Sequence, residues 1–338
     1  MKKFLAVTVF VAMAIVLGAV GCQRKEKSKD VYRIAVIPKG TTHVFWKSIH
    51  AGAVKAEQEL KEWGVEVIWK GPLKEDDRES QIRVMEDFTT RGVSGIVLAP
   101  LDDTALRRPV KDAASNGIPV VIIDSGLKSE DYVSFVATDN YIGGRKGGEH
   151  LAKILGGKGK VIMLRYQEGS ASTANREQGF LDVLKEKYPQ IEVVSANQYG
   201  GATTESAYQA SENLLAPLRA PDGGLMIDGI FCPNESTAFA MLRALQDSGL
   251  AGKVKYVGFD SSERLVQGLH RGEIHGLVLQ DPINMGYLGV KTMVRHLRGE
   301  KVEKRIDTGS VVATPENMNE PRIRELLEPD FKKWLKEG

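Results

Sequence analysis

The chain contains only two cysteines among its 338 residues, and it lacks the short motifs that mark common metal, nucleotide and hydrolase sites. Its six histidines form no His-Glu-x-x-His pair and no cluster with cysteine, which argues against a zinc site. The glycine runs at 143–148 and 156–160 lack the spacing of a dinucleotide-binding or phosphate-binding loop. No Gly-x-Ser-x-Gly sequence surrounds a candidate nucleophile. We therefore predict a protein that is not an enzyme and that uses no metal or cofactor.

An excess of charge of one sign is also missing. The 46 Lys and Arg residues and 44 Asp and Glu residues give a formal charge of +2, and two of the lysines lie in residues 1–21, which contain no acidic residue. The rest of the chain is therefore balanced and has no basic field to attract nucleic acid. We expect no nucleic-acid partner. The length is enough for about two domains of ordinary globular composition.

One long apolar run is present, at the N-terminus. Lys2 and Lys3 precede an uncharged stretch at 4–20, and Gly21-Cys22 follows. This order is typical of a secretory signal peptide, here residues 1–21. The segment before Cys22 resembles a bacterial lipobox, which implies cleavage before Cys22 and lipidation of that cysteine. An uncleaved membrane anchor is the alternative, and in both cases the folded part lies outside the cytoplasm.

The charged segment 22–31 has no apolar period and predicts a flexible tether between the membrane and the folded part. With Cys22 lipidated, Cys232 has no partner for a disulfide. Its place in the apolar sequence Gly-Ile-Phe-Cys-Pro predicts a small buried side chain.

From Tyr32 onward, short β-branched segments alternate with segments of helical period. Such alternation predicts parallel strands joined by right-handed helical crossovers. Two runs of this kind favour an α/β fold with two Rossmann-like lobes and doubly wound parallel sheets. The expected strands are 33–38, 65–71, 95–100, 119–125, 133–140, 160–165, 191–197, 229–234, 255–260 and 276–281.

Helices are expected at 43–60, 179–188 and 204–215, among others. A final strand is expected at 306–314, and a charged helical tail follows it to Gly338.

Three predicted strands end in a polar side chain, namely Asn234, Asp260 and Gln280. In open α/β sheets, ligands bind beyond the carboxyl ends of the strands. Lys39 and Asp124 follow earlier strands in the same way. Each residue alone could be a helix cap or a solvated loop residue, but together they favour one binding site.

Other candidates lie beside these strand ends. Arg176 opens a helix, and His43 lies in the loop after the first strand. Phe45 and Trp46 begin the first helix, and we expect one of them in the core and the other against the apolar face of a sugar ring. Amides and carboxylates can each bind two groups of a ligand, so the set is suited to a small polyhydroxylated compound.

Seven segments resemble, in order, the periplasmic sugar-binding proteins of ABC importers of the ribose-binding type. The resemblance runs from about residue 32 to 315 and implies two lobes joined by a three-strand hinge, closing over one monosaccharide. It also implies an ABC importer permease as partner and, with the lipobox, a monomer anchored by Cys22 in the periplasm or at the cell surface. The segments are 34–46, 119–125, 137–144, 171–180, 230–245, 256–263 and 276–290.

The resemblance also implies domain boundaries and ligand contacts. The N-terminal lobe would comprise 32–138 with 281–309, the C-terminal lobe 139–280 with 310–316, and the tail 317–338. The implied ligand contacts are Lys39, His43, Phe45, Trp46, Asp124, Ser125, Arg176, Asn234, Asp260 and Gln280.

The first-lobe residues depart from the ribose-binding pattern. Ribose-type sites have Ser and Asn where this chain has Lys39 and His43, and Arg where it has Ser125. An aromatic residue expected near Ala202 is also missing. We therefore expect a sugar other than ribose. The first-lobe segments resemble those of rhamnose and autoinducer-2 binding proteins, although Arg176 and Asn234 do not fit the autoinducer pattern.

Other functions stay open at this point. A binding protein that feeds a chemoreceptor or sensor kinase would have the same site, and turnover of a bound sugar would reveal an enzyme. A transcriptional regulator of the same fold is disfavoured, because a signal peptide stands where a DNA-binding segment would be.

Overall fold

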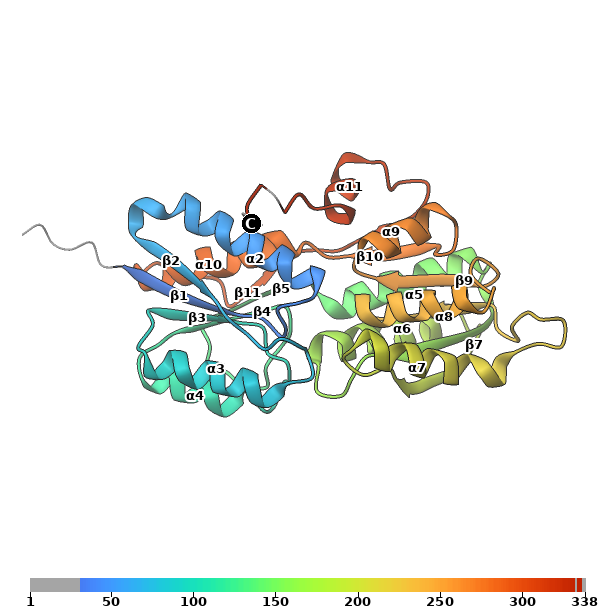
Figure 1. Ribbon diagram of the computed structural model, residues 1–338, viewed down its shortest axis with the longest axis horizontal. Coiled ribbons are helices and arrows are strands. Elements are labelled where there is room, and N and C mark those ends of the chain that lie inside the picture. The colour runs from blue at the N-terminus through green and yellow to red at the C-terminus, as the bar shows by residue number, and fades with distance from the viewer. Residues whose placement is uncertain (1–30, 332, 336–338) are drawn as a thin grey trace, which may run out of the picture. The chain divides into compact units, whose positions relative to one another are not determined.

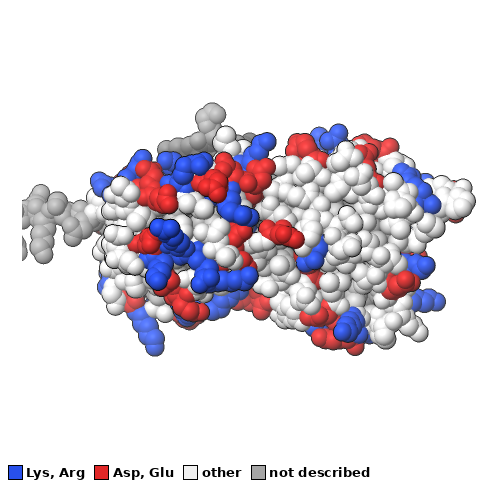
Figure 2. All heavy atoms as spheres, turned by 90° about the horizontal axis from the view of Figure 1, so that it is seen from below, with Lys and Arg blue, Asp and Glu red and all other residues white. Residues whose placement is uncertain are grey.

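The computed structural model describes residues 31–331 and 333–335 (Figure 1). The predicted signal peptide, Cys22 and most of the tether lie outside the described residues. Within the described part, no helix has the combination of length and apolar composition needed to cross a membrane. Lys and Arg are interspersed with Asp and Glu on the face drawn in Figure 2, as expected from the balanced charge.

The first lobe is built on a six-stranded sheet with the order β11-β5-β4-β3-β1-β2, in which every paired strand is parallel. Its strands are β1 (Tyr32–Ile37), β2 (Val65–Trp69), β3 (Gly95–Leu98), β4 (Val120–Ile123), β5 (Ser134–Ala137) and β11 (Arg305–Asp307). Its helices are α2 (Val44–Glu59), α3 (Arg78–Thr90), α4 (Arg107–Ser115) and α10 (Pro282–Leu297), with a short 3-10 helix at Lys61–Trp63.

The second lobe has a six-stranded sheet with the order β12-β10-β9-β8-β6-β7, in which only β12 runs antiparallel to its neighbour among the described pairings. Its strands are β6 (Lys158–Arg165), β7 (Gln190–Tyr199), β8 (Gly229–Phe231), β9 (Lys255–Phe259), β10 (Gly276–Leu279) and β12 (Val311–Ala313). Its helices are α5 (Asn140–Ile154), α6 (Ala171–Lys187), α7 (Thr204–Leu215), α8 (Glu235–Asp247), α9 (Glu263–His270) and α11 (Pro321–Leu327), with a short 3-10 helix at Ala216–Leu218.

Each sheet is covered by helices on both faces. In the first lobe, α2 and α10 share one apolar core with the sheet, and α3 and α4 share another on the opposite face. In the second lobe, α5 and α6 cover one face and α7, α8, α9 and α11 the other. Strands buried on both faces explain the continuous apolar sequences of β3 and β4, in which every residue is buried.

The described chain passes between the two sheets three times, from β5 to α5, from β10 to α10 and from β11 to β12. The predicted α/β fold with two doubly wound lobes is confirmed. Cys232 is fully buried in the second-lobe core, as its apolar neighbours indicated.

The predicted final strand at 306–314 is wrong as a single element. It is two short strands, β11 and β12, which belong to different sheets. Gly309 between them has a φ of +75°, a left-handed conformation that interrupts an extended strand.

The helix predicted at 179–188 begins eight residues earlier, at Ala171. Its polar first turns carry no apolar period, but they pack closely on α5. A Cβ at Gly144 of α5 would lie 1.9 Å from the carbonyl oxygen of Arg176, so only glycine permits this approach. The glycine run at 143–148 therefore brings two helices together.

The tail predicted as a charged helix is α-helical only over Pro321–Leu327 among the residues that the structure describes. Ile323 and Leu327 of this helix pack into the second-lobe core together with Met318. The charged tail therefore contains an apolar stripe that packs on the second lobe.

Candidate ligand-binding site

A cavity lies between the carboxyl ends of the two sheets. Both lobes contribute to its wall, because parallel strands of each sheet end at the cleft. The lining residues are Lys39, His43, Phe45, Trp46, Glu75, Asp124, Tyr166, Ser172, Thr173, Arg176, Asn234, Glu235, Asp260 and Gln280.

The structure brings nine of the ten candidate residues into this wall. Ser125 is the exception. Its side chain is fully buried beside the cavity, and its hydroxyl accepts a hydrogen bond of 3.1 Å from the backbone N–H of Ser172. Ser125 therefore joins the lobes behind the wall. The sequence alone could not show whether Ser125 lies in the wall, as its neighbour Asp124 does, or behind it.

Arg176 is held by the second lobe itself. Its Nε donates to Asn140 Oδ1 at 2.7 Å and its Nη1 donates to the carbonyl oxygen of Pro233 at 2.9 Å. The guanidinium lies 4.0 Å from the ring centroid of Phe259 and 3.7 Å from Asp260 Oδ2. Burial lowers the pKa of Arg176, although nearby carboxylates led by Asp260 oppose that shift.

Asp260 is the acidic partner in this half of the site. Burial raises the pKa of its carboxyl, and the charge of Arg176 and a hydrogen bond from Gln280 oppose the shift. Gln280 Nε2 donates to Asp260 Oδ1 at 2.7 Å, whereas Gln280 Oε1 is buried without a hydrogen-bond partner among the described residues. Gln280, which lines the cavity, therefore keeps one buried acceptor without a described partner.

Asn234 begins α8 and keeps both ends of its amide near that helix. Its Nδ2 donates to Ser236 Oγ at 2.9 Å, and its Oδ1 accepts from Thr237 Oγ1 at 2.6 Å. These bonds fix the side-chain direction at the edge of the cavity. An amide has donor and acceptor capacity beyond one bond on each side, so ligand contacts remain available.

Asp124 and Asp260 share an unusual backbone. They are the non-glycine residues with positive φ in the described chain, at 61° and 67°. Each directly follows the equivalent strand of its lobe, β4 or β9, and each N–H bonds to the adjacent strand, at Val136 or Val278. A left-handed residue costs about 1–3 kcal/mol and persists where its surroundings impose it, often at a binding site.

Lys39 lies almost fully buried across the cavity from the second lobe, with 3% of its surface exposed. Its ammonium is 3.0 Å from Asp124 Oδ2. It also donates to Ser172 Oγ at 3.1 Å and to Ser170 Oγ at 3.4 Å, both in the second lobe. The buried charge is thus compensated by an ion pair and two hydroxyls.

Two carboxylates of the wall were not predicted. Glu75, in the loop between β2 and α3, accepts from Trp46 Nε1 at 2.7 Å and from the hydroxyl of Tyr166 at 2.6 Å. It lies in a run of charged residues at 74–79 that has no distinguishing pattern. Tyr166 directly follows β6, so the strand-end argument that found Asp260 could also have found it.

Glu235 is the other unpredicted carboxylate, and it contacts His43 Nε2 from the opposite lobe. Burial disfavours the charged form of His43, but the carboxylate of Glu235, together with those of Glu75 and Asp260, favours it more strongly. The pKa of His43 is therefore raised to about 9. Burial likewise opposes the charge of Glu235, and the pKa of Glu235 is lowered because His43 is close. In the sequence, an acidic residue in the first turn of a helix is indistinguishable from a helix-dipole partner.

One residue of the aromatic pair lies in the core, as expected, and the contact of the other with a sugar stays a prediction. Trp46 is 2% exposed and packs in the core between α2 and the first sheet. Phe45 is half-buried and meets the Trp46 ring edge to face, with centroids 5.1 Å apart. Phe45 is therefore the aromatic surface with more freedom to meet a ligand.

Residues 34–301 match the family described as periplasmic binding protein domain. This chain belongs to that family. The resemblance seen in the sequence is thus confirmed, and membership implies a solute-binding protein located outside the cytoplasm. No group of three or more side chains that could hold a metal ion occurs in the described residues.

Individual relatives extend over nearly the whole chain. A D-ribose/D-allose-binding protein of Pseudomonas aeruginosa is 31% identical over 325 residues, covering 93% of this chain and 96% of the relative. A ribose import binding protein of Haemophilus influenzae is 29% identical over 307 residues, covering 90% and 97%. A carbohydrate transporter solute binding protein from Agrobacterium radiobacter, solved with D-arabinose, has a TM-score of 0.83 and 35% identity, covering 88% of this chain and 99% of that chain.

Proposed function

We propose that this protein binds a single monosaccharide between its lobes and delivers it to an ABC importer. The observation that carries the proposal is the convergence of charged and amide side chains from both lobes on one cavity. Clefts between two halves of a protein are common sites for small ligands. Relatives with D-ribose, D-allose or D-arabinose in their descriptions support a sugar as ligand.

The side chains provide complementary hydrogen-bonding groups for vicinal hydroxyls. Asp124 and Asp260 are acceptors, Arg176 is a charged donor, and the free Oε1 of Gln280 can accept one more hydroxyl. A site that satisfies its buried groups with ligand hydroxyls rejects an analogue that lacks one, because a buried polar group is then left unpaired. We expect discrimination among epimers to come from these four residues.

Phe45 is the proposed platform for the apolar face of the ring. It is half-buried at the cavity, so a sugar packed on it would exclude water from the aromatic face. The departures at Lys39, His43 and Ser125 support a sugar other than ribose. Ser125 supports Ser172 through a hydrogen bond and is not proposed as a ligand contact.

Delivery of the sugar to the importer depends on closure of the two lobes over it. A ligand that contacts both lobes stabilises the closed arrangement by its difference in affinity for the closed and open states, and permease subunits can recognise that arrangement. We propose that the lobes comprise 32–138 with 281–309 and 139–280 with 310–316. We also propose that the protein is a monomer, held at the membrane by lipidated Cys22 and the tether at 22–31.

A thermal-shift screen with D-ribose, D-allose, D-arabinose and D-fucose tests the proposal, with an open-chain polyol as control. A sugar present at 100 times its Kd should stabilise the protein by about 2.7 kcal/mol, which raises Tm by several degrees. If no monosaccharide raises Tm, sugar binding is disproved. Uptake of the stabilising sugar by cells with and without the gene then separates an importer from a sensor, because only an importer loses uptake.

A further inference from the structure

Among the polar contacts that join the lobes, three pair side chains with side chains around the cavity. We call this set the interlobe clasp. Each contact pairs one first-lobe side chain with second-lobe side chains: Lys39 with Ser170 and Ser172, Glu75 with Tyr166, and His43 with Glu235.

The ammonium of Lys39 has no N–H left for a ligand. A lysine has three donors, and here they point to Asp124 in its own lobe and to Ser170 and Ser172 in the other lobe. Two of the three partners are thus reached only when the lobes are together. The residue that the sequence suggested as a ligand contact is bonded entirely to protein.

The imidazole of His43 bonds across the cleft through Nε2. Its Nε2 contacts Glu235 across the cleft, and its Nδ1 lies 3.2 Å from the backbone N of Phe45, at the start of α2. Protonation of Nδ1 would give up that weaker cap bond while strengthening the contact to Glu235. In the doubly protonated form, which the raised pKa favours, the contact of Nε2 with Glu235 is the one that remains.

The rim of the cleft shows the same close approach in its backbone. The N–H of Asp103, after β3, donates to the carbonyl oxygen of Gly169, before α6, at 2.9 Å. A Cβ at Gly169 would lie 2.4 Å from a carboxylate oxygen of Asp102. Gly169 also has a φ of +86°, so glycine is needed for both the turn and the contact.

We propose that Lys39 and His43 are positioning residues of this clasp, which populates the closed arrangement of the lobes before any sugar binds. Their partners are satisfied by closure alone, so closing has a driving force that is independent of the ligand. When the closed state that binds the ligand is rare, the apparent affinity falls in proportion to its population. A closed state that is populated without the sugar avoids that loss. The inference depends on the fold and these contacts, and not on the proposed ligand.

Small-angle X-ray scattering of the sugar-free protein tests this directly. The purified protein is unfolded, washed and refolded, and mass spectrometry verifies that no sugar is retained. The wild type should have the radius of gyration of the closed arrangement. A variant with Tyr166→Phe, Ser170→Ala, Ser172→Ala and Glu235→Gln should shift to a larger radius. These four changes leave the Lys39–Asp124 pair intact, and His43 is the one first-lobe group of the clasp that loses a charged partner.

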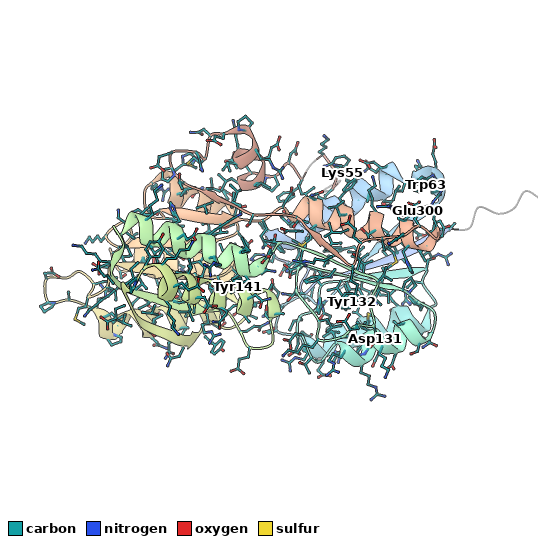
Figure 3. The ribbon with its side chains drawn as sticks, turned by 180° about the vertical axis from the view of Figure 1, so that it is seen from behind. Lys55, Trp63, Asp131, Tyr132, Tyr141 and Glu300 are labelled. Atoms are coloured by element: carbon teal, nitrogen blue, oxygen red, sulfur yellow. The ribbon has the colours of Figure 1, made fainter. Side chains whose placement is uncertain are left out.

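A matched control carries the same types of change away from the cleft: Tyr141→Phe, Ser211→Ala and Glu300→Gln. Tyr141 and Ser211 bond within the second lobe, and Glu300 pairs with arginines on the first lobe (Figure 3). The control should scatter like the wild type. Far-UV circular dichroism confirms folding, and if the fourfold variant does not fold, Tyr166→Phe with Glu235→Gln replaces it. A wild type that is open without sugar, or a folded clasp variant with an unchanged radius, overturns the proposal.

Discussion

The two lobes share one strand order but hold their halves of the cavity differently. In the second lobe, Arg176 and Gln280 bond to groups of that same lobe. In the first lobe, Lys39 and His43 find partners across the cleft. Arg176 and Gln280 are therefore held within their own lobe, whereas the bonds of Lys39 and His43 are completed when the lobes meet.

This difference separates two tasks that a hinged binding protein must perform. A prearranged half costs little ordering on binding and is suited to selecting the ligand. A half whose bonds cross the cleft is suited to controlling closure. Both halves nevertheless keep a left-handed aspartate after equivalent strands, Asp124 and Asp260, so the difference arises in the surroundings of these residues.

The largest effect is expected from Asp260→Ala in the prearranged half. Loss of a buried carboxylate that accepts ligand hydroxyls should weaken sugar binding roughly 100-fold or more and abolish the thermal shift, since truncating a buried charged partner costs about 2–5 kcal/mol. Asp247→Ala, on the exposed surface of the same lobe, is the control. Full stabilisation of Asp260→Ala by the cognate sugar would remove Asp260 from the site.

Arg176→Met should lower the free energy of unfolding by about 3 kcal/mol, because it leaves Asp260 buried without its cation. Urea denaturation of the sugar-free protein measures the change. Arg243→Met removes an exposed ion pair of the same lobe and should change stability by less than about 0.5 kcal/mol. Equal midpoints for the two variants would mean that this half of the site is not held together as described.

A smaller effect is expected from Phe45→Ala on the closing side. Loss of one aromatic face should weaken sugar affinity by roughly five- to tenfold, corresponding to about 1 kcal/mol, when titrated calorimetrically. Trp63→Ala, an exposed aromatic on the first lobe that Figure 3 labels, should leave the affinity unchanged. An unaltered affinity in Phe45→Ala would exclude ring stacking at this position.

The smallest effect is expected from a change of pH, which titrates His43 and so weakens its pair with Glu235 across the cleft. Since the pKa of His43 is raised from 6.5 to about 9, its contribution to stability is complete below pH 6.5 and is lost as the pH rises through 9. The Tm of the wild type should therefore fall more between these pH values than that of Glu235→Gln. Parallel curves for the two proteins would show that the pair does not form.

The sequence predicted much of the second-lobe site because its residues follow strand ends directly. Asp260 and Gln280 come immediately after buried apolar strands, so the topology alone brings them to the cleft. Glu75 and Glu235 escaped prediction because a carboxylate in a charged loop or in a first helical turn is common on any surface. Their role depends on partners distant in the chain, Tyr166 for Glu75 and His43 for Glu235.

The apolar and β-branched periods of the sequence by themselves determined two layered α/β lobes, since each strand must bury both faces under helices. The same periods could not determine that 306–314 divides between two sheets, or that Ser125 lies behind the cavity wall. Nor could they determine that Lys39 and His43 are bonded to the opposite lobe. Those features were decided by tertiary structure, because hydrogen bonds and ion pairs depend on distances between segments that local sequence does not encode.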